Sequence, residues 1–99
     1  MLSCVFFYLF MFQVAIIIIN YNFEELTIGL IKSILKYTSK DLNYQIIIVD
    51  NDSERESFIK LESFLKQFKG QENIQLIRSE INTGFGGGNN LGVAYADSN

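Results

Sequence analysis

The stretch Val14-Ala15-Ile16-Ile17-Ile18-Ile19, followed directly by Asn20-Tyr21-Asn22, decides the fold. A β-branched apolar run that ends in a polar turn is typical of a buried strand in a parallel sheet. Two later stretches repeat the arrangement: Ile46-Ile47-Ile48-Val49 precedes Asp50-Asn51-Asp52-Ser53, and the run at 74–78 precedes a polar, glycine-rich stretch at 82–90. If the three runs are parallel strands, the polar stretches share the sheet edge where open α/β sheets bind ligands.

Amphipathic segments fill the intervals between the predicted strands. Asn22 with Glu25, and Ser53 with Glu56, have the spacing of capping boxes, so a helix is expected to begin at each pair. The second helix would end near Gly70. The buried stripes would contain Phe23, Leu26, Leu30, Ile31, Ile34 and Leu35 in the first helix, and Phe58, Leu61, Phe64, Leu65 and Phe68 in the second.

A third helix completes an alternating pattern. After a loop from residue 79 to about 87, this helix is expected to begin near Gly88 and to turn Leu91, Ala94 and Tyr95 inward. The order β-α-β-α-β-α predicts parallel strands with right-handed crossovers. As in a Rossmann-type half, the strand order should be 3-2-1, which leaves the first strand with a free edge.

Length and composition exclude several classes of protein. The chain has 99 residues, which allows one small domain at most. The net charge is -3 and no basic cluster occurs, so nucleic acid is not an expected partner. One cysteine and no histidine exclude a disulfide framework and a Cys/His metal site, so that any metal would need oxygen ligands.

The ends of the chain suggest a leader and a truncated domain. Residues 1–12 are uncharged and mostly apolar, and three interpretations stay open: a membrane anchor, an extra apolar element packed on the sheet, or a translated leader before a start at Met11. We favour the leader or a poorly ordered tail. Residues 13–99 are interpreted as the first part of a larger domain, because three parallel strands make a thin sheet with open edges.

The glycine-rich stretch is a candidate phosphate site. Glycines permit close backbone approach, and exposed N–H groups at the start of a helix suit an anion, which points to Gly86, Gly87 and Gly88. Neither the dinucleotide fingerprint nor the P-loop spacing is present. The alternative is a flexible loop that binds no ligand.

The other two polar stretches offer contacts to a nucleoside. At the sheet edge, Asp50 is placed to accept hydrogen bonds from a ribose or a base, whereas Ser53 is expected to cap the helix. Asp50-Asn51-Asp52 has the spacing of a metal-binding D-x-D, but the strand ends within it, so we do not predict a metal there. The ring of Tyr21, between Asn20 and Asn22, is placed either to stack on a base or to pack beneath the helix.

Taken in order, these motifs resemble the family 2 glycosyltransferases, and most closely their rhamnosyltransferase-like branch. The resemblance spans about residues 13–96. It implies a GT-A (Rossmann-like) domain of which this chain is the parallel nucleotide-binding half, and sugar transfer from a nucleotide-diphosphate-sugar donor. Residue by residue, Tyr21 would contact the base, Asp50 and Asn51 would bind the nucleoside, and Asn89 stands where many relatives have an Arg near the diphosphate.

The same resemblance implies what this chain lacks. The family's metal-binding D-x-D, for Mg or Mn, and its catalytic base follow a fourth strand, so no catalytic or metal-binding residue is expected here. The acceptor would be a glycan or a lipid-linked saccharide in cell-surface polysaccharide biosynthesis. The enzyme would be cytoplasmic, with possible peripheral contact at the membrane face.

Two other functions stay open at this point. The chain could be a non-catalytic nucleotide-binding module or a decayed gene fragment. A sugar nucleotidyltransferase shares the fold class but needs basic residues in a glycine-rich loop near the first strand, and residues 20–24 supply neither.

Overall fold

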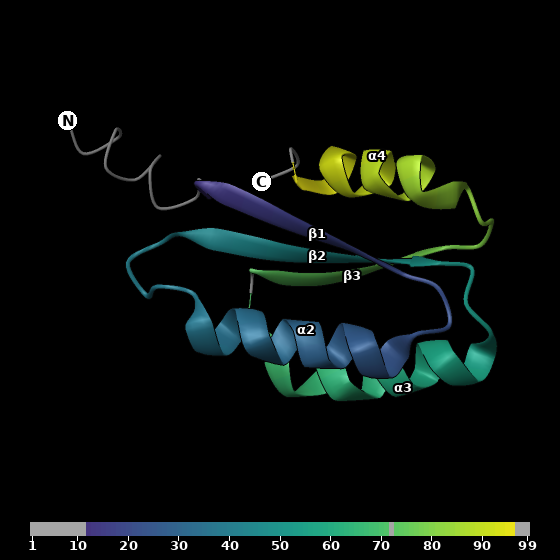
Figure 1. Cartoon of the computed structure of the whole chain (residues 1–99), viewed down its shortest axis with the longest axis horizontal. Helices are drawn as coiled ribbons and strands as arrows, with labels where there is room; N and C mark the ends of the chain where they lie inside the picture. Colours follow the sequence, from purple (N-terminus) through teal and green to yellow (C-terminus); the bar gives the residue numbers. More distant parts are fainter. Residues whose placement is uncertain (1–11, 72, 97–99) are drawn as a thin grey trace.

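A parallel three-stranded sheet forms the centre of the molecule (Figure 1). The computed structural model describes residues 12–71 and 73–96. The strands are β1 (Val14–Asn20), β2 (Tyr44–Asn51) and β3 (Ile74–Ser79), in the spatial order β1-β2-β3. Both pairings are parallel, so the predicted strands and the predicted 3-2-1 order, with β2 in the middle, are confirmed.

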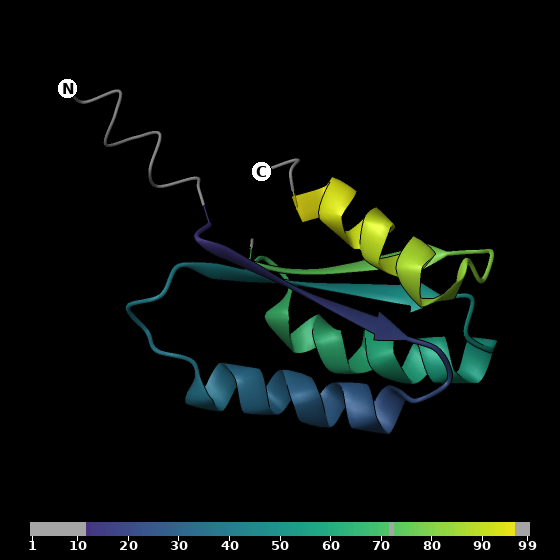
Figure 2. The same ribbon diagram turned by 45° about the horizontal axis from the view of Figure 1, so that its top comes forward.

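Helices cover both faces of this sheet (Figures 1 and 2). Helix α2 (Glu24–Tyr37) and helix α3 (Arg55–Leu65) lie side by side on one face, and a short 3-10 turn, η1 (Lys66–Phe68), continues α3. Helix α4 (Gly84–Ala96) lies alone on the opposite face among the described helices. The result is the predicted α/β class: a Rossmann-like half with alternating strands and helices.

The hydrophobic core has one layer on each side of β2. Ile46, Ile48 and Leu61 belong to the layer between the sheet and helices α2 and α3. Ile47 and Val49 face the layer under α4. Because β2 is central and covered on both faces, its side chains from Gln45 to Asn51 are all buried. This explains why the run 46–49 is apolar at every position and does not alternate with polar residues.

Both predicted capping boxes are wrong. The N-cap of α2 is Phe23 and that of α3 is Glu54, and neither makes a side-chain cap hydrogen bond. The Asn22 side-chain Oδ1 instead accepts the Glu54 N–H at 2.7 Å, and Ser53 Oγ accepts the Asn22 N–H at 2.9 Å. These short polar side chains therefore tie the loop after β1 to the loop after β2, a cross-loop use that sequence spacing does not reveal.

The buried stripe of α2 is narrower than predicted. Ile31 is fully buried, but Phe23, Leu26 and Leu30 are 64%, 72% and 48% exposed. The physical reason is the position of α2 beside β1, which is an edge strand in the described part of the chain. With no strand beyond β1 in this part, the outer flank of the helix extends past the sheet.

Helix α4 also differs from the prediction. It begins at Gly84 and not near Gly88, so the glycines expected in a loop are helical. Gly88 and Gly92 are its buried residues, whereas Ala94 and Tyr95 are exposed and only Leu91 packs inward as expected. Glycines without side chains let the helix backbone lie directly on the isoleucines of β1, and this selects the buried face.

No helix in the described part of the chain is both long and apolar enough to cross a membrane. The three interpretations of the apolar leader concern residues 1–12, which lie almost entirely outside the described residues.

Candidate functional site

Three loops meet at the carboxyl-end edge of the sheet, as the sequence predicts. Register places the strand ends side by side, because Asn20 pairs with Asp50, and Asp50 pairs with Arg78. The loops that follow at 21–23, 52–54 and 80–83 therefore leave the sheet at the same edge (Figure 1).

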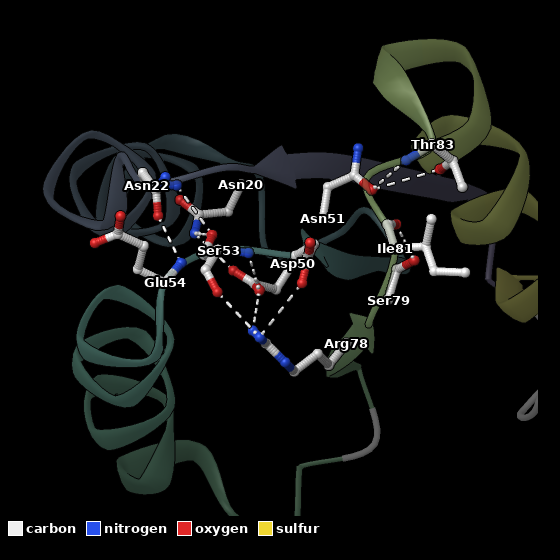
Figure 3. Close-up of polar contacts among 11 residues, drawn as sticks. Asn20, Asn22, Asp50, Asn51, Ser53, Glu54, Arg78, Ser79, Ile81 and Thr83 are labelled. Carbon is white, nitrogen blue, oxygen red and sulfur yellow. Dashed lines mark hydrogen bonds and ion pairs between the residues drawn. The ribbon is translucent and has the colours of Figure 1, made fainter.

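Asp50 lies beneath these loops as a buried counterion. Its side chain is 0% exposed. Oδ1 accepts a hydrogen bond from Asn20 Nδ2 at 2.9 Å, and Oδ2 accepts from the Ser53 N–H at 3.1 Å and from Arg78 Nη1 at 2.6 Å (Figure 3). Protein donors thus hold both carboxylate oxygens, and the predicted hydrogen bond from Asp50 to a ribose or base stays a prediction.

Arg78 is a polar residue of this edge that sequence reasoning missed. Its Nη2 donates to the Ser53 carbonyl at 3.0 Å and lies 3.9 Å from Asp52 Oδ1. The guanidinium also stacks over the Phe58 ring, 4.6 Å from the centroid. Arg78 lies near the end of β3, and the register between β2 and β3 places it opposite Asp50. Sequence spacing alone does not give this register, so the sequence carried no direct signal for the contact.

Asn20 connects the same network to α2. Its Nδ2 also donates to Ser53 Oγ at 3.2 Å, and its Oδ1 accepts from Thr27 Oγ1 at 2.7 Å. Asn20 is 0% exposed, so it anchors the end of β1 internally. Asn22, the third predicted residue of this loop, is exposed, and its backbone has φ +58.

Asn51 lies at the opposite side of the network and faces the loop after β3. Its amide bonds to the turn at 82–84, whose Thr83 is drawn with it in Figure 3. Asn51 is 3% exposed and lines an open cleft of about 380 Å³ between the loop after β1 and the start of α4.

The cleft is the candidate ligand site. Its lining consists of Ile19, Tyr21, Phe23, Asn51, Asn82, Gly84 and Phe85. Three of these residues present aromatic rings, with Tyr21 47%, Phe23 64% and Phe85 75% exposed. The structure therefore brings Tyr21 and Asn51 together as predicted, leaves Asp50 outside the lining, and adds Phe23, Asn82 and Phe85.

The first turn of α4 borders this cleft through Gly84 and Phe85. The Gly84 N–H donates to Asn82 Oδ1 at 2.8 Å. Gly86 lies in the first turn, where N–H groups have no acceptor within the helix, whereas the α-helical pattern pairs the Gly88 N–H with the Gly84 carbonyl. Gly88 is buried against β1 and Asn89 is half-buried one residue further on. Of the predicted phosphate-binding glycines, Gly86 thus offers the freest donor.

The two carboxylates at this edge, Asp50 and Asp52, already have a cationic neighbour. Arg78 forms the ion pair with Asp50 and lies near Asp52, so a cation of the protein already occupies the space between the two carboxylates. Across residues 12–71 and 73–96 no cluster of three or more His, Cys, Asp or Glu side chains could hold a metal ion.

A second groove, of about 390 Å³, runs along β3 and helix α3. Its lining includes Phe58, Leu65, Phe68, Ile74 and Leu76, together with Lys66 and Lys69. It contains none of the predicted site residues, so we do not assign the ligand to it.

The fold and the cleft define a Rossmann-like α/β protein with a candidate ligand site at the carboxyl ends of its strands. Residues 15–99 match the sequence profile of the family described as glycosyl transferase family 2. Because the match covers most of the chain, the protein belongs to the family 2 glycosyltransferases. A search of curated proteins found no significant match.

Proposed function

We propose that this chain is the donor-nucleotide half of an inverting glycosyltransferase and that the cleft binds the nucleoside diphosphate of the donor. One observation carries the proposal: in a chain of this family, exposed aromatic rings and the first turn of a helix line the same cleft at the strand ends. A nucleotide needs this combination, a flat apolar surface for the base next to donors for the phosphates.

The aromatic rings suit the base. Tyr21 comes from the loop after β1 and Phe85 from the first turn of α4, so the two rings approach the cleft from different elements. Stacking of a base on an aromatic side chain contributes about 1–3 kcal/mol and tolerates any base. The cleft therefore favours nucleotides as a class without selecting one base.

The start of α4 suits the diphosphate. The helix N-terminus carries partial positive charge and free N–H groups, and the first turn contains no acidic residue. Gly86 has no atom near its missing side chain, so a phosphate can approach the backbone there. We assign the diphosphate to this turn, with Asn89 in the turn that follows.

We assign an indirect role to the buried residues Asp50 and Asn20. They join the ends of β1, β2 and β3 through Ser53 and Arg78, and so hold the loops that form the cleft. Asn22 contributes in the same way, through its bond to the loop after β2.

We further propose, from family membership, that the acceptor is a glycan or a lipid-linked saccharide, as in the rhamnosyltransferase-like branch. The residues described here contribute donor binding. We expect the divalent metal and the base that deprotonates the acceptor hydroxyl to be held by residues of a full-length enzyme other than those described, and we assign no step of the reaction to this chain.

Calorimetric titration of the chain with UDP, dTDP and GDP tests the proposal. Tyr21→Ala should weaken binding of the best ligand about fivefold to a hundredfold, the equivalent of losing one stacked base. The matched control is Tyr37→Ala, because Tyr37 is a 76% exposed ring at the other end of α2. Equal affinities in the two variants would place the nucleotide elsewhere.

A further inference from the structure

We propose that Asn51 is a positioning residue: its amide fixes the turn at 82–84 and thereby sets one wall of the cleft. The nucleoside-binding role expected from the sequence needs a side chain with unused donors or acceptors. The hydrogen bonds of Asn51 leave none. The inference rests on the proposed function only for the nature of the ligand, because the hydrogen bonds between Asn51 and the turn at 82–84 form within the protein.

Every hydrogen-bonding position of the Asn51 amide has a partner within the protein. Nδ2 donates to Asn82 Oδ1 at 3.3 Å and to the Gly84 carbonyl at 3.0 Å. Oδ1 accepts from the Thr83 N–H at 3.1 Å and from Thr83 Oγ1 at 3.4 Å. An asparagine amide has two donor hydrogens and two acceptor lone pairs, so it is fully used.

Two backbone groups fix the orientation of this amide. The Thr83 N–H can only donate and the Gly84 carbonyl can only accept, so the oxygen of Asn51 must face Thr83 and its nitrogen must face Gly84. The usual ambiguity between the two ends of an amide does not arise here.

A carboxylate in this position could not hold the same turn. It would accept from Thr83, but its second oxygen would face the Gly84 carbonyl and Asn82 Oδ1, where donors are required. Asn51 is almost fully buried, and Arg78 is already paired with Asp50. A charge at residue 51 would therefore be both unpaired and desolvated, which is strongly unfavourable.

The turn that Asn51 holds carries the wall of the cleft. Asn82, Gly84 and Phe85 line the cleft, and Asn82 Oδ1 accepts the Gly84 N–H at 2.8 Å in the same set of bonds. Gly84 has φ +75 and begins α4, so the turn also sets where the first free N–H groups of that helix point. Releasing the turn would move the Phe85 ring and these donors together.

The first test needs no ligand. Amide hydrogen exchange, followed by NMR, should become about tenfold faster at Thr83 in Asn51→Ala, because the Thr83 N–H loses its acceptor. It should also rise at Gly84 in Asn51→Ala and in Asn51→Asp, because the Gly84 N–H is bonded to Asn82 Oδ1, which loses the Asn51 donor that helps to hold it in place. The core strand β2 serves as the internal reference. Asn43→Asp, at the opposite end of the sheet, is the control for added charge. Unchanged exchange at Thr83 and Gly84, or a rise shared equally by β2, would overturn the inference.

The second test reaches the same turn without altering Asn51. A Cβ on Gly87 would lie 2.5 Å from Thr83 Cβ and Oγ1, so Gly87→Ala must displace Thr83. The substitution also raises helix propensity, which offsets part of the cost of this contact, and the exchange of the β2 amides reports whether the fold is retained. Gly29→Ala in α2, where the added Cβ meets nothing within 4 Å, is the matched control.

Titration with UDP, dTDP and GDP completes the design. Asn51→Ala and Gly87→Ala should each lower the affinity of the best ligand about tenfold, whereas Asn43→Asp and Gly29→Ala should leave it unchanged. If the turn loosens and affinity does not fall, Asn51 holds the turn without positioning the wall, and the inference is wrong. If the unmodified chain binds no nucleotide, the proposed function fails, while the exchange experiment still decides whether Asn51 fixes the turn.

Discussion

Substitution of Gly92 by alanine should separate the two effects that a glycine has in a helix. Gly92 is buried in α4, and a Cβ added there would lie 2.5 Å from Ile17 Cγ2 and 3.3 Å from two further carbons of Ile17. A separation of 2.5 Å is well inside van der Waals contact, so either α4 must move away from β1 or Ile17 must leave its preferred rotamer. Overpacking of this kind costs about 1–3 kcal/mol.

Gly29 supplies the matched control. It lies in α2, its φ is not positive, and an added Cβ would meet nothing within 4 Å. Alanine should therefore stabilise the helix there by about 0.5–1 kcal/mol, since glycine is the poorer helix former. Both substitutions gain this propensity term, so the difference between the two variants isolates the packing of α4 on β1.

Urea unfolding followed by far-UV circular dichroism measures that difference. Gly92→Ala should be about 1–3 kcal/mol less stable than Gly29→Ala, which for a domain of this size corresponds to a difference in Tm of at least about 4 °C. Equal stabilisation by the two alanines would refute the reasoning, because it would mean that α4 does not rest on β1 through Gly92.

Two further predictions concern the buried network. Arg78→Met keeps much of the contact with the Phe58 ring but leaves Asp50 buried without its cation. Urea unfolding should show that the free energy of unfolding falls by about 3 kcal/mol, and a loss under about 1 kcal/mol would mean that the ion pair does not stabilise the fold. Ser53→Ala should cost about 0.5–1.5 kcal/mol by removing the acceptor of the Asn22 N–H and one of the acceptors of Asn20 Nδ2. The exchange of the Asn22 amide should rise while the Phe58 amide, bonded to the Glu54 carbonyl in α3, stays protected; fraying of α3 alone would restore the capping interpretation.

The sequence by itself determined the sheet and the shared edge. The run Ile46-Ile47-Ile48-Val49 is apolar at every position, as only a strand covered on both faces can be, and it became the central strand. Polar residues directly after each run then had to gather at one edge, because parallel strands end on the same side. This argument alone placed Tyr21 and Asn51 at the edge where they line the same cleft, and their contact with a nucleotide stays a prediction.

The roles of the polar side chains depended on contacts that only the tertiary structure decides. Ser53 has the local spacing of a helix cap, yet its hydroxyl accepts from Asn22, 31 residues earlier. Asp50 looked available to a ligand until register placed Arg78 against it, 28 residues later in the chain. The same side-chain oxygen can accept either from an N–H of the nearby helix or from a donor that is distant in the sequence. Sequence spacing reveals only the first of these two possible hydrogen bonds.

Packing likewise decided which faces of the helices are buried. Periodicity identified α2, but the width of its buried stripe depends on how far the sheet extends beneath it, so Leu26 is exposed while Ile31 is not. The glycines of α4 predict a loop by propensity, and they form a helix because the missing side chains let its backbone settle on Ile17 and Ile19. Helix propensity describes the preference of a residue that is surrounded by water. In α4 the glycines pack on β1, and this packing determines their conformation.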